Sequence, residues 1–133
     1  MIGLTQAFLS YTAAKILDYD ETYAVLGGLI PGLSLFLIYT GPLQYEGVLL
    51  SFISAGFFSL TTYLISGKEA SKGLFTGYSC SLLLESLTFS YLPVFYPFTG
   101  FQGLGLFSSF DPLFNLSVIA FCLLVLTGQG LKN

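Results

Sequence analysis

The chain has 133 residues, of which 54% are hydrophobic and only 8% are charged. An ordinary soluble domain has about 25% charged residues, so this composition is typical of an integral membrane protein, and the length suits one domain over residues 1–133. The net charge of −3 and the four lysines argue against a nucleic-acid partner. With no histidine and one methionine in the sequence, the usual ligands of haem and redox metals are missing, and no cofactor is expected.

Long apolar stretches predict an all-α, polytopic transmembrane helix bundle of about five helical segments, of which about four or five span the bilayer. The first covers about residues 2–17 and is short for a full crossing, because a helix rises only about 1.5 Å per residue. Its first cation, Lys15, follows the apolar part, so the segment is not expected to be a cleavable signal peptide. The second segment runs from about Tyr23 to Tyr39 and is interrupted by Pro31.

The third segment, about residues 47–66, is the cleanest predicted span, and the fourth covers about residues 71–91. The fifth begins at Asp111-Pro112 and ends near Thr127. An aspartate at the N-cap accepts hydrogen bonds from free N–H groups, and proline at the first helical position has none to leave unsatisfied, so Asp111 is interpreted as structural. Residues 92–110 are rich in Pro, Gly and aromatic residues and are predicted to form a long loop or re-entrant segment over the bundle.

The distribution of lysines predicts the topology. With five spans, the connections near residues 18–22 and 67–72 lie on the same side as the C-terminus, and all four lysines lie on or beside that side. The opposite connections, residues 40–46 and 92–110, carry none. The positive-inside rule therefore places the C-terminus in the cytoplasm.

Small residues predict close packing between helices. Gly28 and Gly32 have the GxxxG spacing in the second segment, and Gly73 and Gly77 repeat it in the fourth. This spacing allows the backbones of two helices to approach closely in lipid.

Glu85 is an acid within an apolar run, residues 77–98, that is long enough to cross a bilayer. Because a charge at that depth is costly by roughly 2.5 to 3.5 kcal/mol, an intramembrane acid is a candidate for function. The main interpretation is a buried, neutral acid bonded to hydroxyl groups such as those of Ser81 or Ser54. A proton relay or ligand site, and a partner for a cation on a neighbouring subunit, are the alternatives.

Residues 77–98 resemble a late motif of the YdjM/YbcI family of membrane-bound metal-dependent hydrolases, also described as LexA-binding inner-membrane hydrolases. The family has a histidine where this chain has Ser81, and usually an aspartate where it has Glu85. The matching residues are Gly77, Glu85, Ser86, Leu87, Thr88, Pro93, Tyr96, Pro97 and Phe98.

Three earlier segments match the same family in order. Thr5-Gln6 corresponds to a Thr-His pair, residues 27–34 to a Gly-x-x-Leu-Pro-Asp-x-Asp segment, and residues 39–44 to a His-Arg-Gly-x-Thr-His segment. The resemblance covers about residues 4–98 and implies a hydrolase fold in a prokaryotic plasma membrane. Backbone-shaping glycines and prolines are kept, whereas the implied ligand positions are changed. These changed positions are Gln6, Gly32, Ser34, Tyr39, Gln44 and Ser81, with Glu85 as the retained acid.

A metal that activates water needs about three imidazole or carboxylate ligands, so neither a metal site nor catalysis is expected from this set. The predicted function is that of a pseudoenzyme, an accessory or scaffold subunit of a larger membrane complex. Its expected partners are the lipid bilayer, bound lipids and other integral membrane subunits, in the plasma membrane of a prokaryote such as an archaeon or in a virion membrane. Two alternatives stay open: a residual membrane hydrolase of phosphate esters or lipid-linked substrates, and a small proton or solute path using Glu85.

Overall fold

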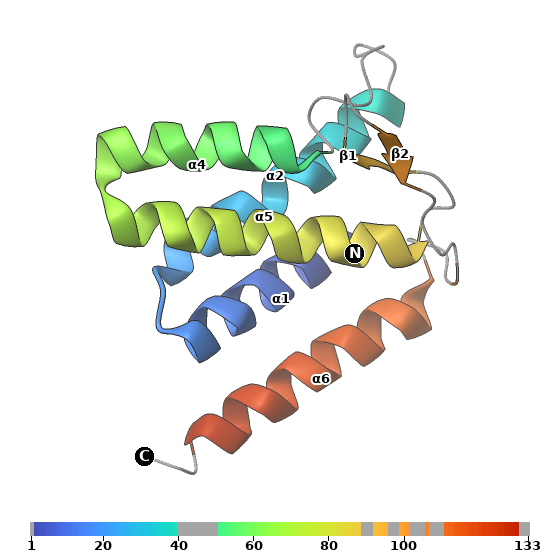
Figure 1. Ribbon diagram of the computed structural model, residues 1–133. Helices are drawn as coiled ribbons and strands as arrows, with labels where there is room; N and C mark the ends of the chain where they lie inside the picture. The colour runs from blue at the N-terminus through green and yellow to red at the C-terminus, as the bar shows by residue number, and fades with distance from the viewer. Residues whose placement is uncertain are drawn as a thin grey trace.

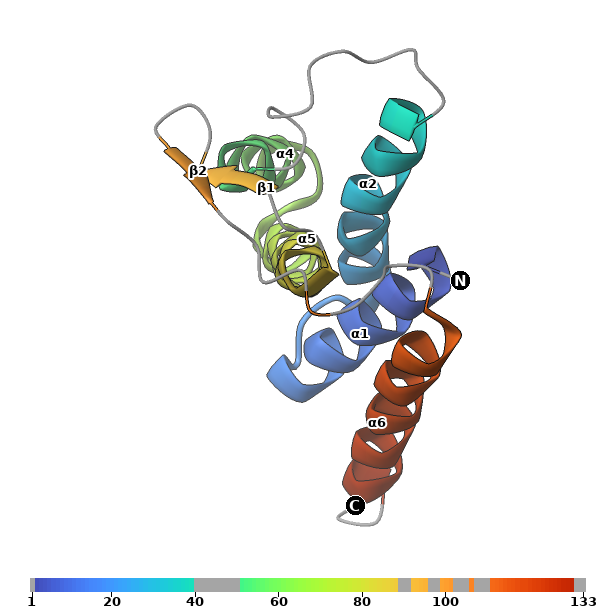
Figure 2. The same cartoon turned by 90° about the vertical axis from the view of Figure 1, so that its right-hand side faces the viewer.

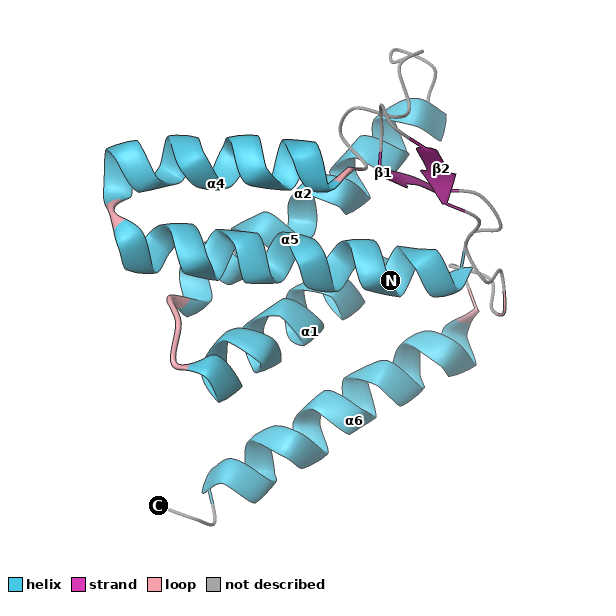
Figure 3. Ribbon diagram, in the orientation of Figure 1, coloured by secondary structure: helices cyan, strands magenta, loops and turns pink. Residues whose placement is uncertain are grey.

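The computed structural model describes residues 2–39, 51–88, 92–95, 99–101, 106 and 111–130. Within these ranges the chain forms five helices and one pair of short strands (Figures 1 and 3). In chain order they are α1 (Ile2–Leu17), α2 (Glu21–Tyr39), α4 (Phe52–Ser66), α5 (Lys68–Thr88), β1 (Leu92–Phe95), β2 (Thr99–Phe101) and α6 (Pro112–Gly130). The prediction of a helical protein with five helical segments is confirmed.

The two strands correct the prediction of a loop or re-entrant segment over residues 92–110. β1 pairs with β2 in an antiparallel arrangement, with Leu92 opposite Phe101 and Phe95 opposite Thr99. Valine and aromatic residues favour extended backbone, and Pro93 is compatible with a strand that has a free edge. Turn-forming residues dominate the composition of this region, so the short strands left no clear periodic signal.

Helix α2 corrects a second prediction, because it continues through Pro31 instead of being interrupted there. A proline inside a helix has no N–H for the carbonyl four residues earlier, here that of Gly27. Pro31 is buried by packing against neighbouring helices, and the Ser81 hydroxyl donates to the carbonyl oxygen of Gly28 at 2.6 Å, one residue beyond the break. Neighbouring helices and serine hydroxyls are known to sustain helices through such a gap.

Helix α5 is the central element of the fold. It packs against α1, α2 and α4, whereas α6 packs against α1. In Figure 2, α4 and α5 are seen nearly end-on, with α4 on one side of α5 and with α1 and α2 on the other. A small apolar core of Ala55, Tyr78 and Leu82 joins α4 to α5, and the Phe58 ring stacks on Tyr78 with 6.2 Å between centroids.

Two glycines of α5 allow α2 to come very close. A Cβ atom on Gly77 would overlap the backbone of Ala24, and one on Gly73 would overlap the backbone carbonyl of Asp20. The contact partners are backbone atoms, which cannot rotate aside as a side chain can. The two helices therefore meet backbone to backbone along this line.

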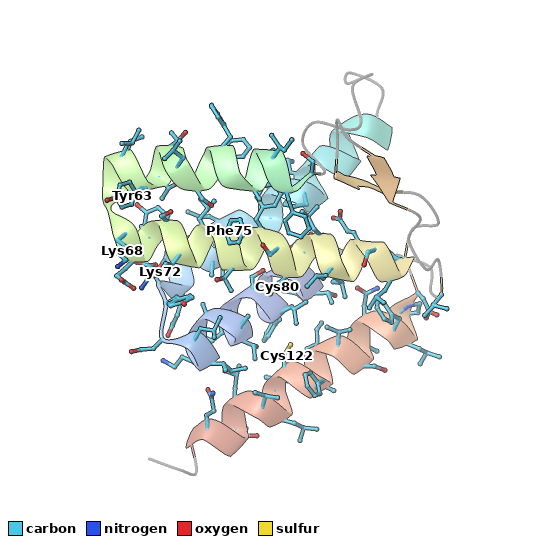
Figure 4. All side chains as sticks on the ribbon, viewed as in Figure 1. Tyr63, Lys68, Lys72, Phe75, Cys80 and Cys122 are labelled. Atoms are coloured by element: carbon cyan, nitrogen blue, oxygen red, sulfur yellow. The ribbon has the colours of Figure 1, made fainter. Side chains whose placement is uncertain are left out.

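Charged side chains gather at one end of the bundle, where α1 leads into α2 and α4 into α5; Figure 4 labels Lys68 and Lys72 there. Lys72 lies 2.9 Å from Glu69 and 5.1 Å from the centre of the Tyr19 ring, so the two connections are neighbours. We call this the lysine end; its charged residues are Lys15, Asp18, Asp20, Glu21, Lys68, Glu69 and Lys72. Of the charged residues in the described ranges, only Glu85 and Asp111 lie elsewhere.

Helix α6 begins as the sequence predicts and ends three residues later than expected, at Gly130. The Asp111 carboxylate accepts hydrogen bonds from the backbone N–H groups of Leu113 at 2.9 Å and Phe114 at 3.4 Å, which confirms its capping role. Among the described residues, α6 is the one helix that is both long and apolar enough to cross a membrane. By length and composition, α6 is therefore a candidate membrane span, and the prediction of four or five spans stays a prediction.

Candidate functional site

Four of the seven positions marked by the hydrolase resemblance lie together where α1, α2 and α5 meet. Gln6 comes from α1, Gly32 from α2, and Ser81 and Glu85 from successive turns of one face of α5. Of the other three, Ser34 and Tyr39 belong to α2, but their side chains are outside the described part of the structure, as is all of Gln44.

The buried carboxyl group of Glu85 is bonded to the side-chain amide of Gln6. Gln6 Nε2 donates to Glu85 Oε1 at 2.7 Å, and the two residues are 0% and 2% exposed. The expectation that hydroxyl groups hold Glu85 is wrong. The Ser81 hydroxyl turns toward α2 and donates to the Gly28 carbonyl oxygen, and that of Ser54 is bonded to a buried tyrosine.

The Gln6 amide reaches Glu85 through a gap left by a glycine. A Cβ atom on Gly32 would overlap the amide oxygen of Gln6, so this oxygen lies where a side chain at position 32 would begin. Gly28 accommodates α1 in the same way, because a Cβ atom added at position 28 would overlap the hydroxyl of Ser10. Helix α1 therefore places two polar side chains against two glycines of α2.

The same face of α1 carries two further hydrogen bonds to other helices. Ser10 Oγ donates to the carbonyl oxygen of Gly77 at 3.2 Å, and Thr5 Oγ1 donates to Asn115 Oδ1 of α6 at 2.6 Å. Thr5, Ser10 and Asn115 are all buried, and none of their contacts is among those predicted from the sequence. Polar residues inside otherwise apolar segments are the signal that could have identified them, since such groups need a partner.

Two oxygen atoms of the Gln6–Glu85 pair have no hydrogen-bond partner among the described residues. Gln6 Oε1 and Glu85 Oε2 are both shielded from solvent and neither is bonded. In most proteins buried polar atoms of this kind are satisfied, so each exception calls for an explanation.

These residues do not fit the divalent metal that the resemblance implies. The site offers one carboxylate, one amide, a hydroxyl already donating to a backbone carbonyl, and a glycine, whereas a hydrolytic metal is held by about three imidazole or carboxylate groups. Within the described ranges, no three Cys, Asp or Glu side chains lie close enough to hold a metal ion. The space between Gly32 and Glu85 is filled by the Gln6 amide.

The resemblance to the hydrolase family remains a prediction based on the motif residues quoted above. No family model matches this sequence, and neither a curated protein nor a solved structure matches the chain.

Proposed function

We propose that this protein is a non-catalytic integral membrane subunit, which serves as a scaffold or accessory part of a larger membrane assembly. The observation that carries the proposal is the position of the Gln6 amide between Gly32 and Glu85. At the place where the resemblance implies a metal centre, protein atoms fill the space, and the described residues bring a single carboxyl group to it. We infer a pseudoenzyme that keeps the architecture of a hydrolase without its ligands.

The surface of the bundle supports residence in a bilayer. Large apolar side chains are exposed on all five helices, a pattern that a monomer in water rarely shows. Exposed hydroxyls donate to carbonyls of their own helix, as those of Thr61, Ser117 and Thr127 do, which is how a hydroxyl is satisfied in hydrocarbon. Examples of the exposed apolar residues are Leu4, Leu26, Phe57, Leu64, Ile65, Leu83, Leu113, Phe121 and Leu124.

The lysine end supports an orientation for this multi-pass protein. Lys68 and Lys72, labelled in Figure 4, lie there, away from β1 and β2. Lys15, paired with Glu21, lies where α1 leads into α2. We place this end, with the C-terminus, on the cytoplasmic side of a prokaryotic plasma membrane, because basic residues accumulate on that side. A virion membrane is the other location that the composition allows.

The proposed partners follow from the shape and size of the protein. A bundle of 133 residues, with all but two of the charged residues in its described ranges at one end, has little surface outside the bilayer and acts through the lateral faces of its helices. Other integral membrane subunits, with lipids bound between them, are the partners that such faces suit.

Purification from the native membrane in a mild detergent tests this proposal. We expect the tagged chain to elute with the same partner subunits at constant stoichiometry in repeated preparations. A multi-pass protein of similar size with the same tag is the control, and it should not bring these subunits with it. Recovery of the chain as a lone, monodisperse monomer would contradict the proposal.

Metal analysis of the same preparation tests the hydrolase alternative. We expect zinc and manganese well below one equivalent per chain, with no change in the Glu85→Gln variant, because one carboxylate and one amide bind such ions weakly. Stoichiometric metal that disappears in Glu85→Gln would instead support a surviving hydrolase.

A further inference from the structure

The buried pair of Gln6 and Glu85 makes one hydrogen bond although its atoms can make more. The amide N–H group of Gln6 donates to one carboxyl oxygen at 2.7 Å. The remaining oxygen of each side chain, Gln6 Oε1 and Glu85 Oε2, is shielded and finds no hydrogen-bond partner in the part of the chain that the structure describes. As an amide and a carboxylate, these two oxygens can only accept hydrogen bonds, so neither can satisfy the other.

In the described part of the chain, the lysines of α1 and α5 lie at the lysine end, and the helix residues named below bring no positive charge to the pair. Helix α1 contributes Gln6 and Ser10, and α2 contributes backbone and the glycines at positions 28 and 32. Helix α4 contributes Ser54, and α6 reaches the bundle through Asn115. None of these groups carries a charge.

The titratable groups in the described part of the chain leave Glu85 without a counter-ion. Tyr78, on the same helix, offers a hydroxyl group that is bonded to Ser54 at 2.9 Å and brings no positive charge. The described lysines are all at the lysine end, where Lys15 is paired with Glu21 and Lys72 with Glu69. Asp111 caps its own helix.

We propose that Glu85 is a proton-binding site: it carries a proton on Oε2 and donates it to Gln6 Oε1. The proton turns one of the two acceptors into a donor, removes an unpaired charge from the interior, and leaves a neutral acid–amide pair with two hydrogen bonds. The pair fastens α1 to α5 and, because α6 packs on α1 through Thr5 and Asn115, it also holds α6 in place. Loss of the proton therefore weakens the attachment of both helices. This inference does not depend on the partners of the proposed function.

Infrared spectroscopy of the purified protein in an ester-free maltoside detergent tests the proton directly. At neutral pH we expect the C=O stretch of one carboxylic acid, which Glu85→Gln removes. Gln6→Leu should move this band to higher frequency, because the acid then loses its amide partner. A spectrum without a carboxylic acid band, or a band that Glu85→Gln leaves unchanged, would overturn the proposal, and an unshifted band in Gln6→Leu would overturn the pairing with Gln6.

The unmodified chain provides a second measurement in case a variant folds poorly. Raising the pH should convert the carboxylic acid band into carboxylate bands and lower the thermal unfolding midpoint over the same interval. Glu85→Gln, whose side chain imitates the neutral acid and cannot ionise, should not lose stability over that interval. A midpoint that falls equally in both proteins would show that other groups cause the pH dependence, and would overturn the proposed proton-dependent attachment.

Discussion

Replacing Gly77 by alanine is expected to lower the free energy of unfolding of the protein by about 1–3 kcal/mol, the range observed when a methyl group is forced into a well-packed interior. The new Cβ atom would overlap the backbone of Ala24 in α2, and backbone atoms can move only if the whole helix moves. Helices α2 and α5 would have to separate, with loss of contacts along their interface. Denaturation in detergent, followed by circular dichroism, measures the change.

Two matched glycines serve as controls for this prediction. A Cβ atom on Gly128 of α6 meets no other atom within 4 Å, so Gly128→Ala should leave stability unchanged or raise it by up to about 1 kcal/mol through helix propensity. Gly28→Ala should have an intermediate effect, because the overlapping Ser10 hydroxyl can rotate away, whereas Ser10 Cβ, 2.9 Å from the new atom, can move only with α1. If Gly77→Ala is as stable as Gly128→Ala, α2 and α5 do not pack as closely as described.

Replacing Gln6 by leucine is expected to destabilise the protein by about 1–3 kcal/mol, because it leaves a buried polar group without its partner. Leucine has a volume close to that of glutamine, so the main loss is the hydrogen bond to Glu85 Oε1 at 2.7 Å. The double variant Gln6→Leu with Glu85→Leu should regain most of this stability, because removing both polar partners removes the unsatisfied group. Unfolding measurements on the wild type, the two single variants and the double variant give the coupling energy.

The control for this cycle is a residue far from the pair. Ser71 is bonded to the carbonyl oxygen of Ser59 at 2.8 Å and lies about four turns of α5 from Glu85. Ser71→Ala should combine additively with Gln6→Leu, as distant substitutions do. If the changes in the free energy of unfolding caused by Gln6→Leu and Glu85→Leu also add up in the double variant, the two residues do not act as a pair.

Several features of the fold could be predicted because they depend on local sequence. The bounds of α1 follow from an apolar run. The start of α6 follows from a capping aspartate beside a proline. Both signals act within a few residues. Pro31 shows where local reasoning fails, because a proline usually interrupts a helix in isolation. Here burial against other helices holds α2 together, and that stabilisation comes from outside the segment.

The candidate site was predicted in part. The resemblance singled out Gln6, Gly32, Ser81 and Glu85, which meet in the structure. Gln6 and Glu85 are hydrogen-bonded although they are 79 positions apart in the sequence. The prediction that a hydroxyl group such as that of Ser81 is bonded to Glu85 is wrong. Ser81 lies one helical turn from Glu85, and this spacing alone favours it as a donor. Its hydroxyl instead points to α2, where the Gly28 carbonyl is accessible.

The sequence by itself determined the helical character of the chain, the positions of most helix ends and the separation of lysines from apolar segments, since each depends on the order of residues along a few turns. Only the tertiary structure decided which polar groups are paired and which are left unbonded. Those contacts depend on how each helix is rotated about its axis and on how closely glycines let the backbones approach. Gln6 meets Glu85 because position 32 has no side chain between them, a relation among three helices that no single segment contains.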